Sequence, residues 1–111
     1  MGLKAQSVGA SVYFGEALLA TNQADAARRE LDTAVGRAEK LGLRVEQARA
    51  QFLLGNASAH SGKPQEAVPH YRQAVGILES ISKEDGATRV LERADLKDIY
   101  RDAAKSYQGG T

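Results

Sequence analysis

YFGEALLATNQADAARRELDTAV, residues 13–35, is followed forty positions later by the related stretch LLGNASAHSGKPQEAVPHYRQAV, residues 53–75. At this offset small residues fall on small residues, as in the pairs Gly15 and Gly55, Ala17 and Ala57, and Ala27 and Ala67. Large residues also coincide, as in Phe14 and Leu54, and Leu31 and Tyr71. Self-similarity at a fixed period is the signature of a repeat architecture. The chain is therefore expected to contain one structural unit twice.

Each copy has the periodicity of α-helices, because its small and apolar residues recur every three or four positions. The pattern predicts helices over about residues 3–20, 24–41, 45–61, 64–82 and 88–107. Their expected buried stripes are Val8, Val12, Gly15 and Leu19; Ala27, Leu31, Ala34, Ala38 and Leu41; Ala48, Phe52, Gly55 and Ala59; Ala67, Tyr71, Ala74 and Leu78; and Leu96, Tyr100, Ala103 and Tyr107. No stretch alternates apolar and polar residues as a β-strand does, so we expect an all-α fold.

Turn residues separate these helices. Asn22, with Asp25 three positions later, resembles the cap that starts a helix. Gly42 is placed to end the second helix in the left-handed conformation, and Gly62 stops the third. Pro64 fits the first turn of the fourth helix, where its missing N–H costs no hydrogen bond. The short turns force each pair of helices into an αα-hairpin.

The expected architecture is an αα-hairpin solenoid that forms a single domain over residues 1–111. Its two hairpins span about residues 3–41 and 45–82, and a capping helix spans about residues 88–107. Small residues in one helix should face large residues in the other, which allows close antiparallel packing. The large partners are Phe14, Leu31, Leu54 and Tyr71.

Residues 48–74 resemble a tetratricopeptide repeat, in which small residues, Leu-Gly, a turn glycine and an aromatic residue follow in a set order. The matching positions are Ala48, Leu54, Gly55, Gly62, Ala67, Tyr71 and Ala74, and residues 8–34 match less fully through Phe14, Gly15, Ala27, Leu31 and Ala34. Gln51 stands where the family has Trp, and Leu18 and Ser58 stand where it has Tyr. The period of forty exceeds the usual value of about 34, as in members of the family with longer helices.

Composition excludes several classes of function. The 111 residues are 42% hydrophobic and 26% charged, which is typical of a soluble globular protein. The formal net charge of +1 lacks the basic surplus of nucleic-acid binders, so no nucleic-acid partner is expected. The chain has no cysteine, and no apolar run approaches the roughly 20 residues of a membrane span. We therefore expect a cytoplasmic protein with no membrane partner.

No constellation of residues predicts catalysis, a metal site or a cofactor. The two histidines, His60 and His70, lie on either side of a tight turn and should not converge. Ser58 lacks the strand-to-helix context of a nucleophile elbow, and the glycines stand singly, without a phosphate-binding loop. The chain is therefore not expected to be an enzyme.

The resemblance implies a non-catalytic protein–protein interaction module that binds a peptide or a neighbouring domain in its concave groove. The first helix of each stacked hairpin lines such a groove, which here predicts the lining residues Val12, Tyr13, Glu16, Arg49, Phe52, Asn56 and His60. Family members that grip a peptide carboxylate often carry Asn at the position of Asn56, but their companion Lys falls on Phe52. A groove surface without any ligand is the alternative.

Cations recur every four residues in the last predicted helix, at Arg89, Arg93, Lys97, Arg101 and Lys105. Because a step of four advances about 40° beyond a full turn, the row winds around the helix. Only one turn of it can face inward, so Lys97 and Arg101 are expected near Arg49 and Asn56. The predicted ligand is an extended acidic peptide with one large apolar residue. The other interpretation is a solvated capping face, in which neighbouring acids pair with the cations.

The first predicted helix has few charges, since Lys4 and Glu16 are the only charged residues between Met1 and Thr21. A helix that is apolar on most sides is buried on most sides. We therefore expect this chain to be the carboxyl-terminal part of a longer array, or to self-associate through this helix. The alternative function is a structural spacer or self-association segment of a larger bacterial signalling or regulatory protein.

Overall fold

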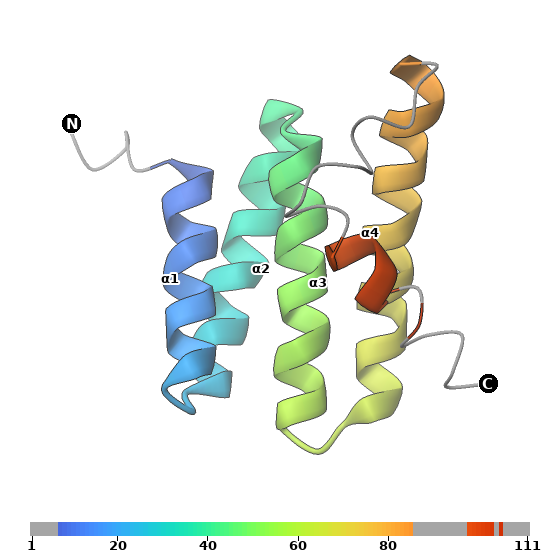
Figure 1. Cartoon of the computed structure of the whole chain (residues 1–111). Helices are drawn as coiled ribbons and strands as arrows, with labels where there is room; N and C mark the ends of the chain where they lie inside the picture. The colour runs from blue at the N-terminus through green and yellow to red at the C-terminus, as the bar shows by residue number, and fades with distance from the viewer. Residues whose placement is uncertain (1–6, 86–97, 104, 106–111) are drawn as a thin grey trace.

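The computed structural model describes residues 7–85, 98–103 and 105, and the regular elements among them are helices (Figure 1). Four follow one another along the chain, namely α1 Val8–Ala20, α2 Ala24–Leu41, α3 Arg44–His60 and α4 Pro64–Asp85. Residues 98–103 and 105, part of the predicted capping helix, are also helical. The described residues contain no strand, and the all-α fold of helical hairpins is confirmed. None of the described helices is both long and apolar enough to cross a membrane.

Helix α3 occupies the centre of the structure. It packs against α1, α2 and α4, whereas α1 packs against α2 and α3 only and lies at the edge of the described helices (Figure 1). The large apolar residues Tyr13 and Phe14 of α1 are exposed in the described part of the chain. The expectation that α1 continues into a longer array or self-associates stays a prediction. It is α3 that is buried on several faces, through Ala48, Ala50, Leu53, Leu54, Gly55, Ala57 and Ser58.

The three turns share one geometry, the Schellman motif. The residue with a positive φ is Asn22 (63°), Gly42 (71°) or Gly62 (76°). The next residue donates its N–H to the carbonyl five positions earlier, at 2.8 Å from Gln23 to Leu18, 2.9 Å from Leu43 to Ala38 and 2.9 Å from Lys63 to Ser58. These bonds satisfy carbonyls that have no partner within the helix. The forty-residue repeat thus includes the turn, because Asn22 and Gly62 are equivalent positions.

The expectation that Asn22 caps α2 is wrong. Asn22 instead ends α1 in the left-handed conformation, and the N-cap of α2 is Gln23, whose side chain makes no capping hydrogen bond. Asn can replace Gly in this role because it tolerates a positive φ better than other residues with a Cβ. Gly42, Gly62 and Pro64 have the expected roles, and Pro64 is the first residue of α4.

Two helix boundaries differ from the prediction by more than one residue. Helix α1 begins at Val8 instead of residue 3, because Ser7 is extended and its Oγ accepts a hydrogen bond from the Ala10 N–H at 3.0 Å. This bond makes Ser7 the N-cap. Helix α4 continues to Asp85, three residues beyond its expected end. The polar residues there are compatible with a helix, and a glycine, a poor helix former, follows them in the sequence at position 86.

In each hairpin, one glycine lets the two helices approach closely. A Cβ on Gly15 would lie 2.6 Å from Leu31 Cγ, and a Cβ on Gly55 would lie 2.6 Å from Tyr71 Cε1. Side chains do not tolerate such contacts without moving apart, since protein interiors are already close-packed. The expected pairing of a small residue with a large one is therefore confirmed for Leu31 and Tyr71.

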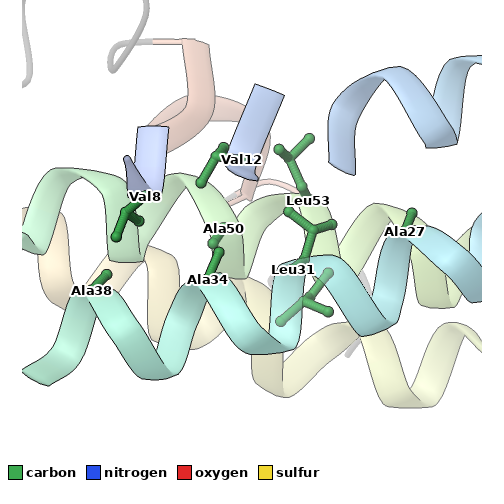
Figure 2. Packing of buried hydrophobic residues seen from close by; sticks show 9 residues of the cluster. Val8, Val12, Ala27, Leu31, Ala34, Ala38, Ala50 and Leu53 are labelled. Atoms are coloured by element: carbon green, nitrogen blue, oxygen red, sulfur yellow. The ribbon is translucent and has the colours of Figure 1, made fainter. Parts of the chain in front are cut away.

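The core of the first hairpin continues into α3 (Figure 2). Three helices contribute to it, with the buried residues Val8, Val12, Ala27, Leu31, Ala34, Ala38, Ala50, Leu53 and Leu54. Three residues expected in the core are exposed instead. Leu41 is the last residue of α2, and Phe14 and Ala59 lie on helix faces that no described segment covers.

The helical residues after α4 pack on the second hairpin. Ile99 belongs to a buried cluster with Ala48, Leu78 and Ile81, and Ala103 belongs to another with Ala67, Tyr71, Ala74 and Val75. Ile99 thus contacts the later part of α4, and Ala103, further along the chain, contacts its earlier part. The last segment therefore runs antiparallel to α4, as the first helix of a third hairpin would. The predicted stripe includes Ala103 and the half-buried Tyr100 but omits Ile99. Leu96 and Tyr107 lie outside the described residues.

Candidate functional site

A hollow of about 240 Å³ lies where α1, α3 and the last helical segment meet, and we call it the groove hollow. Its lining residues are Tyr13 and Glu16 of α1, Arg49, Phe52 and Leu53 of α3, and Ile99. These segments are the first helices of the two hairpins and the segment that follows, so the hollow lies on the inward face of the stack. Most of the lining is aromatic or aliphatic, and the two charged residues have opposite signs.

Helical spacing explains which side chains reach this hollow. Tyr13 and Glu16 are three positions apart in α1, and Arg49 is three and four positions before Phe52 and Leu53 in α3, so each set shares one helix face. Other faces of these helices pack within the hairpins: the face of α1 with Gly15 lies against α2, and the face of α3 with Gly55 lies against α4. The groove residues are therefore left on the side where the two first helices meet.

Four of the residues predicted for the groove gather in this hollow, namely Tyr13, Glu16, Arg49 and Phe52. Of the other predicted lining residues, Asn56 and His60 line a neighbouring hollow. Val12 belongs to the core, with 1% of its surface exposed, and does not face the groove. Val12 is equivalent to Phe52 in the repeat, but in α1 this position is buried in the core of the first hairpin.

Arg101, the predicted groove cation that lies among the described residues of the last segment, lines neither this hollow nor its neighbour. Arg101 pairs with Asp98 at 3.3 Å and with Asp102 at 3.2 Å, both within its own segment. This pairing agrees with the interpretation of an exposed capping face, in which neighbouring acids pair with the cations. Lys97, Arg89 and Arg93 lie outside the described residues.

Two lining residues, Leu53 and Ile99, are absent from the prediction. The signal for Leu53 was the repeat itself, since Leu53 lies forty positions after Tyr13, which was predicted. The signal for Ile99 was its spacing of four from Ala103. Each of them belongs to a buried cluster and also lines the hollow, and a division of positions into core and surface does not predict such a double role.

The neighbouring hollow has a volume of about 440 Å³ and continues along the seam between α1 and α3. It is lined by Glu16, Leu19, Ala20, Asn22, Leu53, Asn56, Ala59 and His60. Because Glu16 and Leu53 line both hollows, the two form one furrow along the first helices. The furrow is more polar at the end near Asn56 and His60 than at the end near Phe52 and Ile99.

Tyr71 of α4 contacts two residues of α3 that line this furrow, Asn56 and Phe52. Its hydroxyl donates a hydrogen bond to Asn56 Oδ1 at 2.6 Å, and its ring lies 5.8 Å from the ring of Phe52 with the planes tilted by 50°. Burial raises the pKa of the Tyr71 hydroxyl, so it remains a proton donor at neutral pH. Since Oδ1 of Asn56 is the acceptor, its amide nitrogen is the group that can donate to a carboxylate or carbonyl oxygen of a ligand.

A second polar cluster joins the two hairpins away from the furrow. His70 Nδ1 lies 2.8 Å from Gln51 Oε1, and Arg28 of α2 lies 4.0 Å from Glu66 of α4. Burial lowers the pKa of His70, and Arg28 lowers it further, while Asp32 and Glu66 act in the opposite direction. No group of three or more residues suited to hold a metal ion occurs within residues 7–85, 98–103 and 105.

A further hollow of about 470 Å³ lies beside α4 and contains none of the predicted groove residues. It is lined by Arg44, Pro69, Arg72, Gln73, Gly76, Ile77 and Ser80. All but Arg44 belong to α4, so this hollow is the flank of a single helix, whereas the furrow joins residues of α1, α3 and the last segment.

Comparison with known proteins agrees with the geometry. The tetratricopeptide repeat family model matches residues 9–80, which include all of α2 and α3 and most of α1 and α4. No curated protein and no solved structure matches the chain significantly. The family match extends over most of both hairpins and includes every lining residue of the furrow except Ile99.

Proposed function

The chain belongs to the tetratricopeptide repeat family, whose repeats generally mediate protein–protein interaction and are typically non-catalytic, and we propose that it binds an extended segment of a protein partner in its furrow. One observation carries this proposal. Side chains from α1, α3 and the last segment, far apart in the sequence, line one hollow on the inward face. Binding sites of this kind combine an apolar lining with a few polar groups that orient the ligand.

The lining favours a ligand with one large apolar side chain. Phe52, Leu53 and Ile99 offer an apolar floor, and Tyr13 stands at the rim with 66% of its surface exposed. Aromatic side chains at such a position supply contact area with little loss of conformational entropy. The apolar residue of the partner is therefore the expected anchor.

The charges of the furrow orient the segment around this anchor. Arg49 favours a carboxylate of the ligand, and Glu16 opposes one at the other side of the hollow. The amide of Asn56 offers a hydrogen-bond donor about two turns beyond Arg49 along α3. We expect a peptide with a single acidic residue close to the anchor, bound weakly and more weakly as salt rises, because these contacts are exposed.

An amide-shift titration tests this proposal. The peptides are a segment with one Glu close to one Phe, the same segment with Phe replaced by Ala, and the same segment with Glu replaced by Gln and the order scrambled, each at low and moderate salt. The first peptide should shift the amide signals of Glu16, Phe52, Leu53 and Ile99, and Tyr13→Ala and Arg49→Ala should weaken its binding. Lys40→Ala, which removes an exposed cation from α2, is the matched control and should bind normally. Shifts confined to α2 and α4, or an equal response to all three peptides, would contradict the proposal.

A further inference from the structure

Four apolar residues form an exposed row along α1, and we call this row the α1 stripe. Its members are Ala10, Tyr13, Phe14 and Ala17, all exposed, and their spacing of three and four puts them on one helix face. The buried residues Val8, Val12 and Gly15 occupy the other side of the helix. Figure 1 shows α1 at the edge of the layer, with no described helix on its outer side.

The repeat allows the α1 stripe to be compared with the equivalent face of α3. Forty positions after the α1 stripe lie Ala50, Leu53, Leu54 and Ala57 of α3, all buried. Ala50, Leu53 and Leu54 belong to the core that α3 shares with the first hairpin. The same face is therefore a helix-packing interface in α3, while in α1 the corresponding small and large residues are exposed.

The order of residues in the α1 stripe is symmetric. It reads small, large, large, small, so a second α1 placed antiparallel would bring Ala10 opposite Ala17 and Tyr13 opposite Phe14 of the other copy. A two-fold axis between residues 13 and 14 relates the two helices, as in the self-complementary interfaces of symmetric dimers. Aromatic side chains that meet at such an axis pack favourably, and the small residues at the ends let the backbones approach.

The charge pattern of α1 also permits this arrangement. No member of the α1 stripe is charged, and Glu16, the one charged residue of α1, lines the groove hollow. Like charges therefore do not meet across the axis. In contrast, the exposed faces of α2 and of the last segment carry acids and bases, which offer a second copy no comparable apolar surface.

We propose that two copies of this chain associate through the α1 stripe, antiparallel to each other about a two-fold axis. The interface is one helix wide, far smaller than the roughly 20–30 residues on each side of a standard interface, so the dimer is weak. The proposal goes beyond peptide binding and does not depend on it. Tyr13 takes part in both surfaces, whereas Phe14 belongs to the α1 stripe alone.

Sedimentation of the full chain over a range of concentrations tests this proposal. The average mass should rise toward that of a dimer with concentration for the natural chain and for the control Leu41→Glu, which alters an exposed apolar residue outside α1. Phe14→Glu and, independently, Ala17→Glu should remain monomeric while circular dichroism shows their helices intact. A natural chain that stays monomeric at about millimolar concentration, or a dimer unchanged by both variants, would overturn the proposal.

Disulfide cross-linking tests the antiparallel orientation, since the chain has no cysteine of its own. A mixture of Ala10→Cys and Ala17→Cys chains should form a mixed cross-linked dimer much faster than either variant alone. In the proposed dimer two copies of residue 10 are offset by about 10 Å along the axis, since each residue rises about 1.5 Å. A disulfide joins Cα atoms only about 4.4–6.8 Å apart. Fast cross-linking of Ala10→Cys alone would indicate a parallel pair and overturn the proposal.

Discussion

Gly55 lies against the ring of Tyr71 so closely that a Cβ at this position would come within 2.6 Å of Tyr71 Cε1. Gly15 has the same relation to Leu31, forty residues earlier. One glycine in the first helix of each hairpin thus faces one large side chain in the second helix. Because Tyr71 also contacts Phe52 and Asn56, the packing of the second hairpin sets the shape of the furrow.

Gly55→Leu should lower the free energy of unfolding by about 1–3 kcal/mol or more, because the new side chain overpacks the contact with Tyr71. Denaturant unfolding measures this change. The matched control is Gly36→Ala, at an exposed helical position where a Cβ meets nothing within 4 Å. This control should raise stability by roughly 0.5–1 kcal/mol through helix propensity. Equal effects of the two substitutions would mean that Gly55 does not face a neighbouring helix.

Tyr71→Phe should cost about 0.5–1.5 kcal/mol, because it removes the hydroxyl that donates to Asn56 but keeps the ring that packs on Gly55 and Phe52. The midpoint of thermal or denaturant unfolding measures the loss. Tyr13→Phe removes a hydroxyl from an exposed ring and should leave stability unchanged. A Tyr71→Phe chain as stable as the natural one would show that the hydrogen bond contributes nothing measurable.

Asn22→Ala should destabilise the chain by about 1 kcal/mol, because alanine is strained at a φ of 63°. Asn22→Gly should not destabilise it and is expected to raise stability slightly, since glycine adopts this conformation freely. Gln23→Ala is the control, because Gln23 makes no capping hydrogen bond to α2. Urea unfolding of the three variants distinguishes the turn role from a capping role, in which Gly would be the poorer residue.

The stability of the chain should fall as the pH decreases below about 6.5, the ordinary pKa of histidine, because of His70. Its pKa is lowered by folding, so the unfolded chain binds the proton more readily, and the free energy of unfolding rises with pH through this window. The loss is complete once the pH is below the pKa of the folded state. Above about 6.5 both states are neutral at this residue, and the effect disappears.

Urea unfolding between about pH 7.5 and pH 5.5, above the range where most carboxylates titrate, measures this dependence. His70→Gln should flatten the profile, because glutamine can replace the contact with Gln51 but does not bind a proton. His60→Gln changes an exposed residue and should keep the slope of the natural chain. An unchanged slope in His70→Gln would assign the pH dependence to other groups.

The sequence alone determined the helices, most of their limits and the stacking unit. These features depend on local and periodic patterns: small and apolar residues every three or four positions, glycine at two turns, and a repeat that places Gly15 on Gly55. A glycine opposite Leu31 or Tyr71 has the same packing consequence in both hairpins, so the close approach could be predicted from the offset of forty.

The tertiary structure decided which of these equivalent faces are covered. Phe14 and Leu54 occupy the same position of the repeat, yet Phe14 is 51% exposed and Leu54 only 2%. The physical reason is that α3 packs against the first hairpin on one side and against α4 on the other, whereas α1 has described neighbours on one side only. Likewise, Ile99 lines one hollow with Tyr13 and Phe52 because a third segment packs on the second hairpin. Burial depends on such neighbours, and helical periodicity within one segment carries no information about them.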